Sequence, residues 1–297
     1  MKSATLNDRN LAKIFLIPSI LIILCLDFYP ILFVMITSLQ SRGLFAKTWD
    51  FVGFKNFLLV FREPNFFVAL KNSVVWTLGT TSSEVILGTM LALLLNRKFM
   101  FRGLARALLL VPYVVPAVVS TLIWKYMFND LFGLFNYVLQ TAGIIKNPIV
   151  FLSSPVLAMI IVISVNVWTY TPFVIITVLA ALQGIDPSLY DSARVDGAGP
   201  LKAFRYITVP SISPILIIVI LLRTVWNFQK FDIIFLMTKG GPLMATTTLP
   251  IMVYNEAFAA YNLGTASTMA IMIFVILALV ALLYIRLFEK VEEKVIA

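Results

Sequence analysis

Four residues near the end of an apolar stretch are suited to contact a ligand inside a membrane. They recur at spacings of three and four, which places them on one helix face: Arg223, Trp226, Asn227 and Lys230. A charge at bilayer depth costs about 3 kcal/mol on insertion scales, so it normally faces a cavity or a partner. Because aromatic rings stack on sugar faces and amides bond hydroxyl groups, this face suits a carbohydrate. Helix packing of the aromatic ring and snorkelling of the cations are the alternative interpretations.

A second group lies in the preceding apolar stretch. Asn166 and Tyr170 share a helix face there, with Trp168 and Thr171 close by. Pro172 opens the helix beside them. We expect Tyr170, Thr171 and Trp168 to contribute to the same substrate site.

Two acidic residues, Asp27 and Glu84, also lie within apolar stretches. Either can pair with Arg223. As intramembrane carboxylates they are also candidates for proton or sodium coupling, which would make the chain an ion-coupled secondary transporter. Both roles stay open at this stage.

The residue types exclude most catalytic chemistry. The chain has no histidine, which excludes a histidine-based triad and an imidazole metal site. Its single cysteine, Cys25, can form neither an intrachain disulfide nor a thiolate cluster. No glycine-rich phosphate loop of the G-x-x-x-x-G-K-S/T type is present, so nucleotide would be bound by other subunits. We predict no catalytic residue, no metal site and no cofactor in this chain.

The composition indicates a membrane protein. Of 297 residues, 61% are hydrophobic and 12% are charged, and the mean hydropathy is +0.98. Soluble domains carry about 25% charged residues, so this chain has too few to cover a surface facing water. A soluble enzyme is therefore excluded. The net charge of +9 has to be considered loop by loop and does not indicate affinity for nucleic acid.

A membrane-spanning helix needs about 20 apolar residues, and six stretches have this length. They cover residues 14–38, 73–95, 104–124, 156–182, 212–236 and 265–287. We predict an all-α polytopic membrane protein with six transmembrane helices in one domain over residues 14–287. The first stretch is too long for the apolar region of a signal peptide, so we expect a retained anchor helix.

Lysine and arginine are unevenly distributed among the loops. With the N-terminus inside, the inner segments hold 13 of these residues and the longer outer segments hold nine. The positive-inside rule therefore places residues 1–13 and the tail 288–297 in the cytoplasm. The outer segments 40–72, 125–155 and 238–262 are rich in aromatic residues. They predict short amphipathic helices at the membrane surface, although a surface that docks a partner has the same pattern.

The inner loop over residues 184–210 is polar and carries strong helix signals. Asp186 and Pro187 suit the N-cap and the first position of a helix, and residues 188–195 can follow as two turns. Gly197 stands where a left-handed turn favours a residue without a Cβ atom.

A second helix can open at Pro200 and run through Phe204 and Ile207 into Pro210. The pattern predicts two helices joined by a sharp turn at the cytoplasmic face. An ordinary capped connection and a docking helix for a soluble partner are both consistent with it.

The same loop resembles the "EAA" signature of permease subunits of ABC importers. The matching residues are Tyr190 to Ala198, followed by Phe204, Ile207 and Pro210, with Asp191 and Ser192 in place of the usual Glu and Ala. The resemblance implies that this helix lies in a groove of an ATPase and moves as a lever. The residues to which it assigns this coupling role are Tyr190, Asp191, Ser192, Ala193, Asp196, Gly197 and Ala198.

A second resemblance narrows the subfamily to carbohydrate-uptake permeases. It is carried by residues 223–232, Leu236 to Pro242, 246–250 and 254–258, and it includes a Gly-Gly-Pro segment. These stretches are similar to the first of two non-identical permease subunits in maltose-type and glycerol-3-phosphate-type importers. In maltose-type relatives the sugar contacts fall on the stretch ending at Thr171-Pro172 and on the face bearing Asn227 and Lys230.

The family resemblance extends from Ile14 to Phe288 and implies the type I permease fold of ABC importers. It further implies a second, homologous permease, an ATPase dimer that binds ATP and magnesium, and an extracytoplasmic solute-binding protein. The substrate would be a sugar or oligosaccharide, and the location the plasma or inner membrane of a prokaryote, in contact with lipid and not with nucleic acid. A secondary transporter using Asp27 or Glu84 would not need the loop at residues 191–198.

Overall fold

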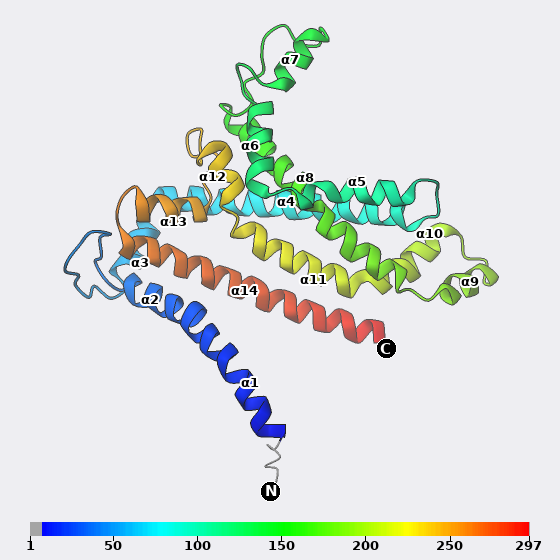
Figure 1. The fold of residues 1–297 in the computed structure, drawn as a ribbon, viewed down its shortest axis with the longest axis horizontal. Coiled ribbons are helices and arrows are strands. Elements are labelled where there is room, and N and C mark those ends of the chain that lie inside the picture. The colour runs from blue at the N-terminus through cyan, green and yellow to red at the C-terminus, as the bar shows by residue number, and fades with distance from the viewer. Residues whose placement is uncertain (1–7, 297) are drawn as a thin grey trace, which may run out of the picture. The chain divides into compact units, whose positions relative to one another are not determined.

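The computed structural model describes the backbone of residues 8–296 and the side chains of residues 15–289 (Figure 1). Within this part of the chain the elements are helices, and the only extended pairings are two isolated bridges, Gln40 with Phe51 and Gly43 with Asn262. The chain divides into two compact units. The first comprises residues 1–64 and 253–274, and the second comprises residues 65–252 and 275–297.

The first unit is built around the N-terminal span. Its elements are α1 (Asp8–Ile23), a π-helical turn (Leu24–Phe28), α2 (Tyr29–Ser38), α3 (Lys55–Arg62) and parts of α13 (Leu249–Phe258) and α14 (Leu263–Ile296). The amide of Asn56 donates to the carbonyls of Ser38 and Gln40, both at 2.9 Å, and the Thr268 hydroxyl donates to that of Ser38 at 3.1 Å. These bonds tie α3 and α14 to the end of α2.

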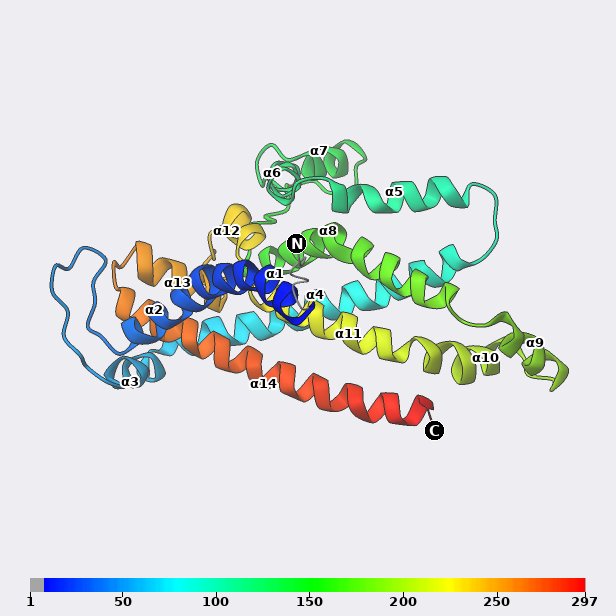
Figure 2. The same ribbon diagram turned by 60° about the horizontal axis from the view of Figure 1, so that its bottom comes forward.

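The second unit holds the remaining elements. They are α4 (Pro64–Asn96), α5 (Arg102–Val114), α6 (Ala117–Met127), α7 (Leu134–Thr141), α8 (Pro155–Gln183), α9 (Pro187–Val195), α10 (Pro200–Ala203), a π-helical turn (Phe204–Thr208), α11 (Val209–Phe228) and α12 (Asp232–Thr238). Helices α4, α8 and α11 lie side by side (Figures 1 and 2). Buried apolar side chains pack between them, among them Trp76, Val162, Val174 and Val219.

The prediction of a helical protein with several membrane spans is confirmed. Five helices of the described part are long and apolar enough to cross a membrane: Phe15–Ser38, Pro64–Asn96, Pro155–Gln183, Pro200–Phe228 and Leu263–Glu289. A sixth span requires α5 and α6 together, and these helices meet at an angle of 93°. The orientation of the termini stays a prediction, and residues 1–7 lie outside the described chain.

The bend between α5 and α6 differs from the single helix expected over residues 104–124. Val115 is extended, with φ −70° and ψ 130°, and Pro116 follows it. A residue before proline is pushed away from the helical region, and the proline lacks the N–H that would continue the helix. The prediction of one span over residues 104–124 took neither Pro116 nor Pro112 as a break.

The fifth span also differs from its predicted bounds of 212–236. The helix opens at Pro200 and continues through the π-helical turn into α11, so it does not end at Pro210 as expected. The turn widens because Pro210 cannot donate a hydrogen bond, and Val209 bonds instead to Phe204 five residues back. At its other end α11 stops at Phe228, and α12 begins at Asp232. Lys230 therefore lies in the connection between α11 and α12 and not on the helix face of Arg223.

The loop that follows α12 contains the Gly-Gly-Pro segment and is hydrogen-bonded to α4 through Met244 and Thr247. Gly240 has φ +89°, and a Cβ atom there would approach the Thr247 hydroxyl to 2.5 Å. That hydroxyl donates to the Gly240 carbonyl at 2.8 Å, while the amide of Asn72 donates to the Met244 carbonyl at 2.8 Å. Glycine is required here because both the left-handed backbone and the close approach exclude a side chain.

Candidate functional site

A buried polar network joins α4, α8 and α11. The Arg223 guanidinium donates from Nε to Glu84 Oε2 at 2.6 Å and from Nη2 to Glu84 Oε1 at 2.8 Å. The amide of Asn166 donates to Glu84 Oε1 at 2.8 Å and to Asn227 Oδ1 at 3.1 Å. The amide of Asn227 donates in turn to Glu84 Oε2 and to the Thr81 hydroxyl, both at 3.1 Å. We call Glu84, Asn166, Arg223 and Asn227 the buried network.

The network is removed from solvent. Glu84 and Asn166 are fully buried, and Asn227 and Arg223 keep 1% and 3% of their surface exposed. A charge at this depth is tolerated only when it is paired and hydrogen-bonded, and the two contacts of Arg223 with Glu84 provide both. Of the two carboxylates proposed as partners of Arg223, Glu84 is the one that pairs with it. Asp27 lies exposed in the first unit.

Tyr170 lies between the network and Lys230. Its ring centroid is 4.9 Å from the Arg223 guanidinium and 4.1 Å from Lys230 Nζ, so both cations contact its π system. Lys230 Nζ also donates to the Tyr170 hydroxyl at 2.5 Å. On its other side Lys230 lies 3.5 Å from Asp232 Oδ1. These contacts fix the ring of Tyr170 at the boundary of the buried region.

Further aromatic rings extend this boundary. Tyr113 on α5 meets Tyr170 edge to face with centroids 6.3 Å apart, and Phe173 meets Trp226 in the same way at 5.3 Å. Tyr113 and Trp226 remain 46% and 44% exposed. We call Tyr113, Tyr170, Phe173, Trp226 and Lys230 the aromatic face. It combines accessible rings with a lysine donor, which is a surface suited to a hydroxyl-rich ligand.

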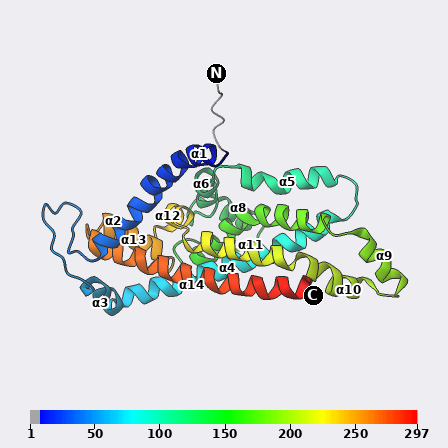
Figure 3. The same ribbon diagram turned by 90° about the horizontal axis from the view of Figure 1, so that it is seen from below.

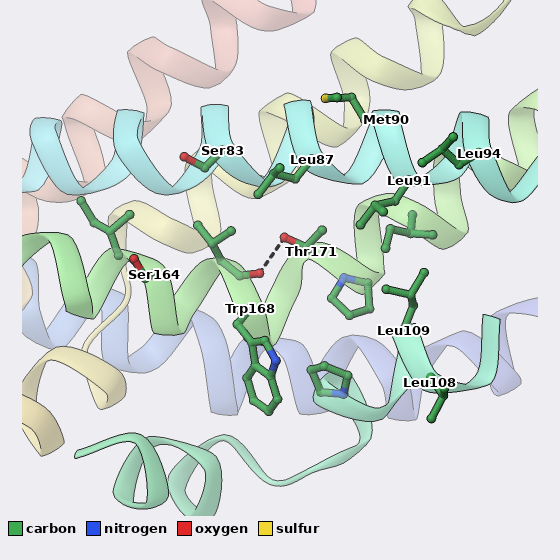
Figure 4. Close-up of a pocket in the computed structure, with 15 residues that line it drawn as sticks. Ser83, Leu87, Met90, Leu91, Leu94, Leu108, Leu109, Ser164, Trp168 and Thr171 are labelled. Carbon is green, nitrogen blue, oxygen red and sulfur yellow. Dashed lines mark hydrogen bonds between the residues drawn. The ribbon is translucent and has the colours of Figure 1, made fainter. Parts of the chain in front are cut away.

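The other two predicted substrate residues lie elsewhere. Trp168 and Thr171 occupy the opposite side of α8 from Asn166 and Tyr170, where they line a cavity of about 660 Å³ between α4, α5 and α8 (Figure 4). Pro172 lines it too and leaves the Trp168 carbonyl without its usual helical partner. The two sets were expected at one site because they are close in the chain. The structure separates them onto two faces of one helix.

Some residues of the site carried no clear signal in the sequence. Tyr113 and Phe173 were not singled out, because an aromatic residue in an apolar stretch is more often a packing residue. Glu84 and Asn166 were noted, but their contacts with Arg223 and Asn227 join segments far apart in the chain. A single sequence does not show such pairings.

The α9–α10 hairpin has the local structure that its sequence predicted. Asp186 caps α9 by accepting a hydrogen bond from the Ser188 N–H at 2.9 Å. This bond lowers the pKa of the Asp186 carboxyl below its ordinary value. At the other end Gly197 has φ +72° and donates to the Arg194 carbonyl at 3.1 Å, while Ala198 donates to that of Ala193 at 2.8 Å. This pair of bonds is the Schellman motif.

The hairpin projects beyond the ends of α8 and α11 (Figures 1 and 3). Its base is fastened by a hydrogen bond of 2.9 Å between the hydroxyls of Tyr190 and Thr208. Three apolar or aromatic side chains are strongly exposed: Val195 at 89%, Leu201 at 80% and Tyr206 at 74%. The pair of Asp191 with Arg194, at 3.1 Å, also faces solvent. Such a surface is typical of a contact site for another protein.

The described residues thus form a polytopic helical membrane protein with a buried ion pair and an exposed helical hairpin. Residues 84–295 match the family described as binding-protein-dependent transport system inner membrane component. The chain belongs to this family of ABC importer permeases, and the recognition made from its two motifs is confirmed. The protein is therefore located in the inner membrane.

Named relatives cover nearly the whole chain. It is 33% identical over 283 residues to the trehalose/maltose transport system permease protein MalF of Thermococcus litoralis, with 94% of each chain covered. It is also 33% identical to the sulfoquinovosyl glycerol transport system permease protein SmoG of Agrobacterium fabrum, covering 95% of this chain and 91% of the relative. A chain of a bacterial ABC transporter that imports the acidic polysaccharide alginate has the same fold, with a TM-score of 0.83 over 94% of this chain and 95% of that one, at 23% identity.

Proposed function

We propose that this chain is a transmembrane subunit of an ATP-driven sugar importer. It forms the translocation path together with a second, homologous permease. An extracytoplasmic solute-binding protein delivers the sugar, and a separate ATPase dimer binds ATP and magnesium. The family match supports the importer, and the printed names of the relatives support a sugar as the substrate. The observation that carries most weight is that residues 84–295, which match the family, contain both the aromatic face and the exposed hairpin.

The α9–α10 hairpin is the contact with the ATPase. Support comes from the exposure of Val195 and Leu201 and from the rigid turn at Gly197. Helix α9 and the turn after it lie in a groove of the ATPase and move with it. Their coupling residues are Tyr190, Asp191, Ser192, Ala193, Asp196, Gly197 and Ala198. Because α10 continues through the π-helical turn into α11, a displacement of the hairpin is passed along one helix to Arg223. Closure of the ATPases thereby switches the permease between inward-facing and outward-facing states.

The sugar contacts the aromatic face. The accessible rings of Trp226 and Tyr113 stack on the ring of the sugar, and Lys230 and the Tyr170 hydroxyl bond its hydroxyl groups. Arg223 and Asn227 do not contact the sugar, because their polar atoms are engaged within the buried network. Arg223 instead supports the ring of Tyr170. Trp168 and Thr171 serve a separate part of the path, along the cavity between α4, α5 and α8.

Reconstitution tests the function as a whole. The chain is co-expressed with a second permease, an ATPase and a solute-binding protein from the same organism, and the complex is placed in proteoliposomes. We expect uptake of a sugar that requires both ATP and the binding protein. Uptake by the chain alone, driven by a proton or sodium gradient, would instead support the ion-coupled alternative.

A further inference from the structure

Both cations at the aromatic face are matched by a carboxylate of the same chain. The Nε–Nη2 edge of the Arg223 guanidinium is occupied by the two oxygens of Glu84, at 2.6 Å and 2.8 Å. Lys230 Nζ lies 3.5 Å from Asp232 Oδ1, and it donates to the hydroxyl of Tyr170. Two positive and two negative charges are thus paired, and the site carries no net charge.

One further lysine in the described part of the chain is also engaged in an internal contact. Lys125, on the neighbouring helix α6, donates from Nζ to the Leu236 carbonyl at 2.7 Å, near the C-terminal end of α12. A helix C-terminus carries partial negative charge, which that lysine offsets. The cavity on the far side of α8 is lined by apolar side chains together with the hydroxyl groups of Ser83, Ser164 and Thr171 and the indole of Trp168, and its lining holds no charged residue.

We propose that the aromatic face selects an uncharged sugar and excludes acidic, phosphorylated and sulfonated ones. The inference rests on the proposed function and specifies its substrate class. Carboxylates, phosphates and sulfonates are recognised by an available guanidinium fork or by an unmatched ammonium group. Here Glu84 occupies the fork of Arg223, and Asp232 offsets Lys230.

The balance of charges also acts against an anion. A negatively charged ligand that left water for this face would lose its hydration without gaining a counter-ion, which strongly disfavours binding. A neutral sugar loses only hydroxyl hydrogen bonds, and it regains them from Lys230 and Tyr170. Its apolar C–H faces are covered by the rings of Trp226 and Tyr113. Net neutrality together with accessible rings therefore favours the uncharged sugar.

The substrate itself supplies the first test. The whole importer is purified with its solute-binding protein, and mass spectrometry identifies the small molecule released on denaturation. If the binding protein is isolated empty, its thermal stability is screened against paired neutral and acidic oligosaccharides. We expect a sugar without an ionised group. An acidic sugar would overturn this inference and leave the proposed function intact, whereas a ligand that is not a carbohydrate would overturn the proposed function.

A charge-changing variant links the selectivity to this chain. Asp232→Asn leaves Lys230 without its carboxylate, while Lys146→Gln changes a distant exposed lysine as the control. Uptake into proteoliposomes is compared for the neutral sugar and for its derivative oxidised to a uronic acid, each preloaded on the binding protein. We expect the parent to prefer the neutral sugar, and Asp232→Asn to reduce that preference about threefold, the scale of a partly exposed ion pair. A preference that is unchanged in Asp232→Asn, or that shifts equally in Lys146→Gln, would overturn the inference.

Discussion

The charged groups of the buried network bind each other, whereas the apolar side chains Val195 and Leu201 of the α9–α10 hairpin face solvent. Glu84 and Arg223 lie in α4 and α11, and both are almost completely buried. Val195 and Leu201 expose most of their surface at the tip of a short helical projection. The network obtains its partners from within the chain, and the hairpin offers contacts that the chain does not use.

The two regions are therefore expected to affect different properties of the protein, its stability and its assembly with other subunits. Removing either Glu84 or Arg223 leaves a buried charge without its counter-ion, so the change lowers the stability of the folded chain. Changing the hairpin leaves the packing of α4, α8 and α11 intact, so the penalty falls on assembly and coupling. Stability measurements and transport measurements should therefore respond to different residues.

The largest effect is expected from breaking the ion pair. Arg223→Met leaves the Glu84 carboxylate buried and unpaired, which costs about 3–5 kcal/mol. We expect little folded protein, measured as a monodisperse peak after detergent extraction. The double variant Glu84→Met with Arg223→Met removes both charges and should restore most of that peak, because apolar side chains of similar size replace a buried pair at little cost. Equal losses in the single and double variants would contradict this account.

A smaller and different effect is expected from the turn of the hairpin. Gly197→Ala places a Cβ atom on a backbone with φ +72°, which costs about 1–2 kcal/mol. Gly199→Ala is the matched control, because Gly199 has φ −73° and also has open space around it. We expect Gly197→Ala to insert normally but to lose ATPase co-elution and transport about tenfold, since 1.4 kcal/mol corresponds to a factor of ten. Equal behaviour of the two variants would show that the turn does not set the docking geometry.

The same contrast explains how far the sequence could predict the structure. The hairpin was predicted residue by residue because its signals are local: an aspartate cap, a proline at the first position and a glycine at the turn. The spans were predicted from their length and hydropathy. The pairing of Glu84 with Arg223 was only one of two possibilities, since contacts between distant segments depend on how the helices pack. The break in the third span was missed because two prolines in an apolar stretch are weak evidence for a bend. The end of α11 was missed because the sequence stays apolar beyond Phe228.

The contribution of the aromatic face can be separated from that of the network. Tyr170→Phe removes the hydroxyl that accepts from Lys230 and keeps the ring over which Arg223 lies. A hydrogen bond of this kind contributes about 0.5–1.5 kcal/mol, so we expect the KM of sugar uptake to rise about threefold to tenfold with ATPase co-elution unchanged. Tyr137→Phe, at an exposed tyrosine of α7, is the control. An unchanged KM would show that the Tyr170 hydroxyl makes no contribution to the sugar site.

The smallest effect concerns the pH dependence of the hairpin. The hydrogen bond from the Ser188 N–H lowers the pKa of Asp186 in the folded chain, so protonation disfavours the capped state. The stability that this carboxylate adds is therefore complete above its ordinary pKa, near 3.9, and is lost as the pH falls through the lower folded value. We expect hydrogen-exchange protection of residues 188–195, corrected for intrinsic rates, to fall in that range. Asp186→Asn keeps a capping oxygen without a titrating group, so its protection should stay level; a parallel fall in both proteins would mean that another group controls the acid sensitivity of α9.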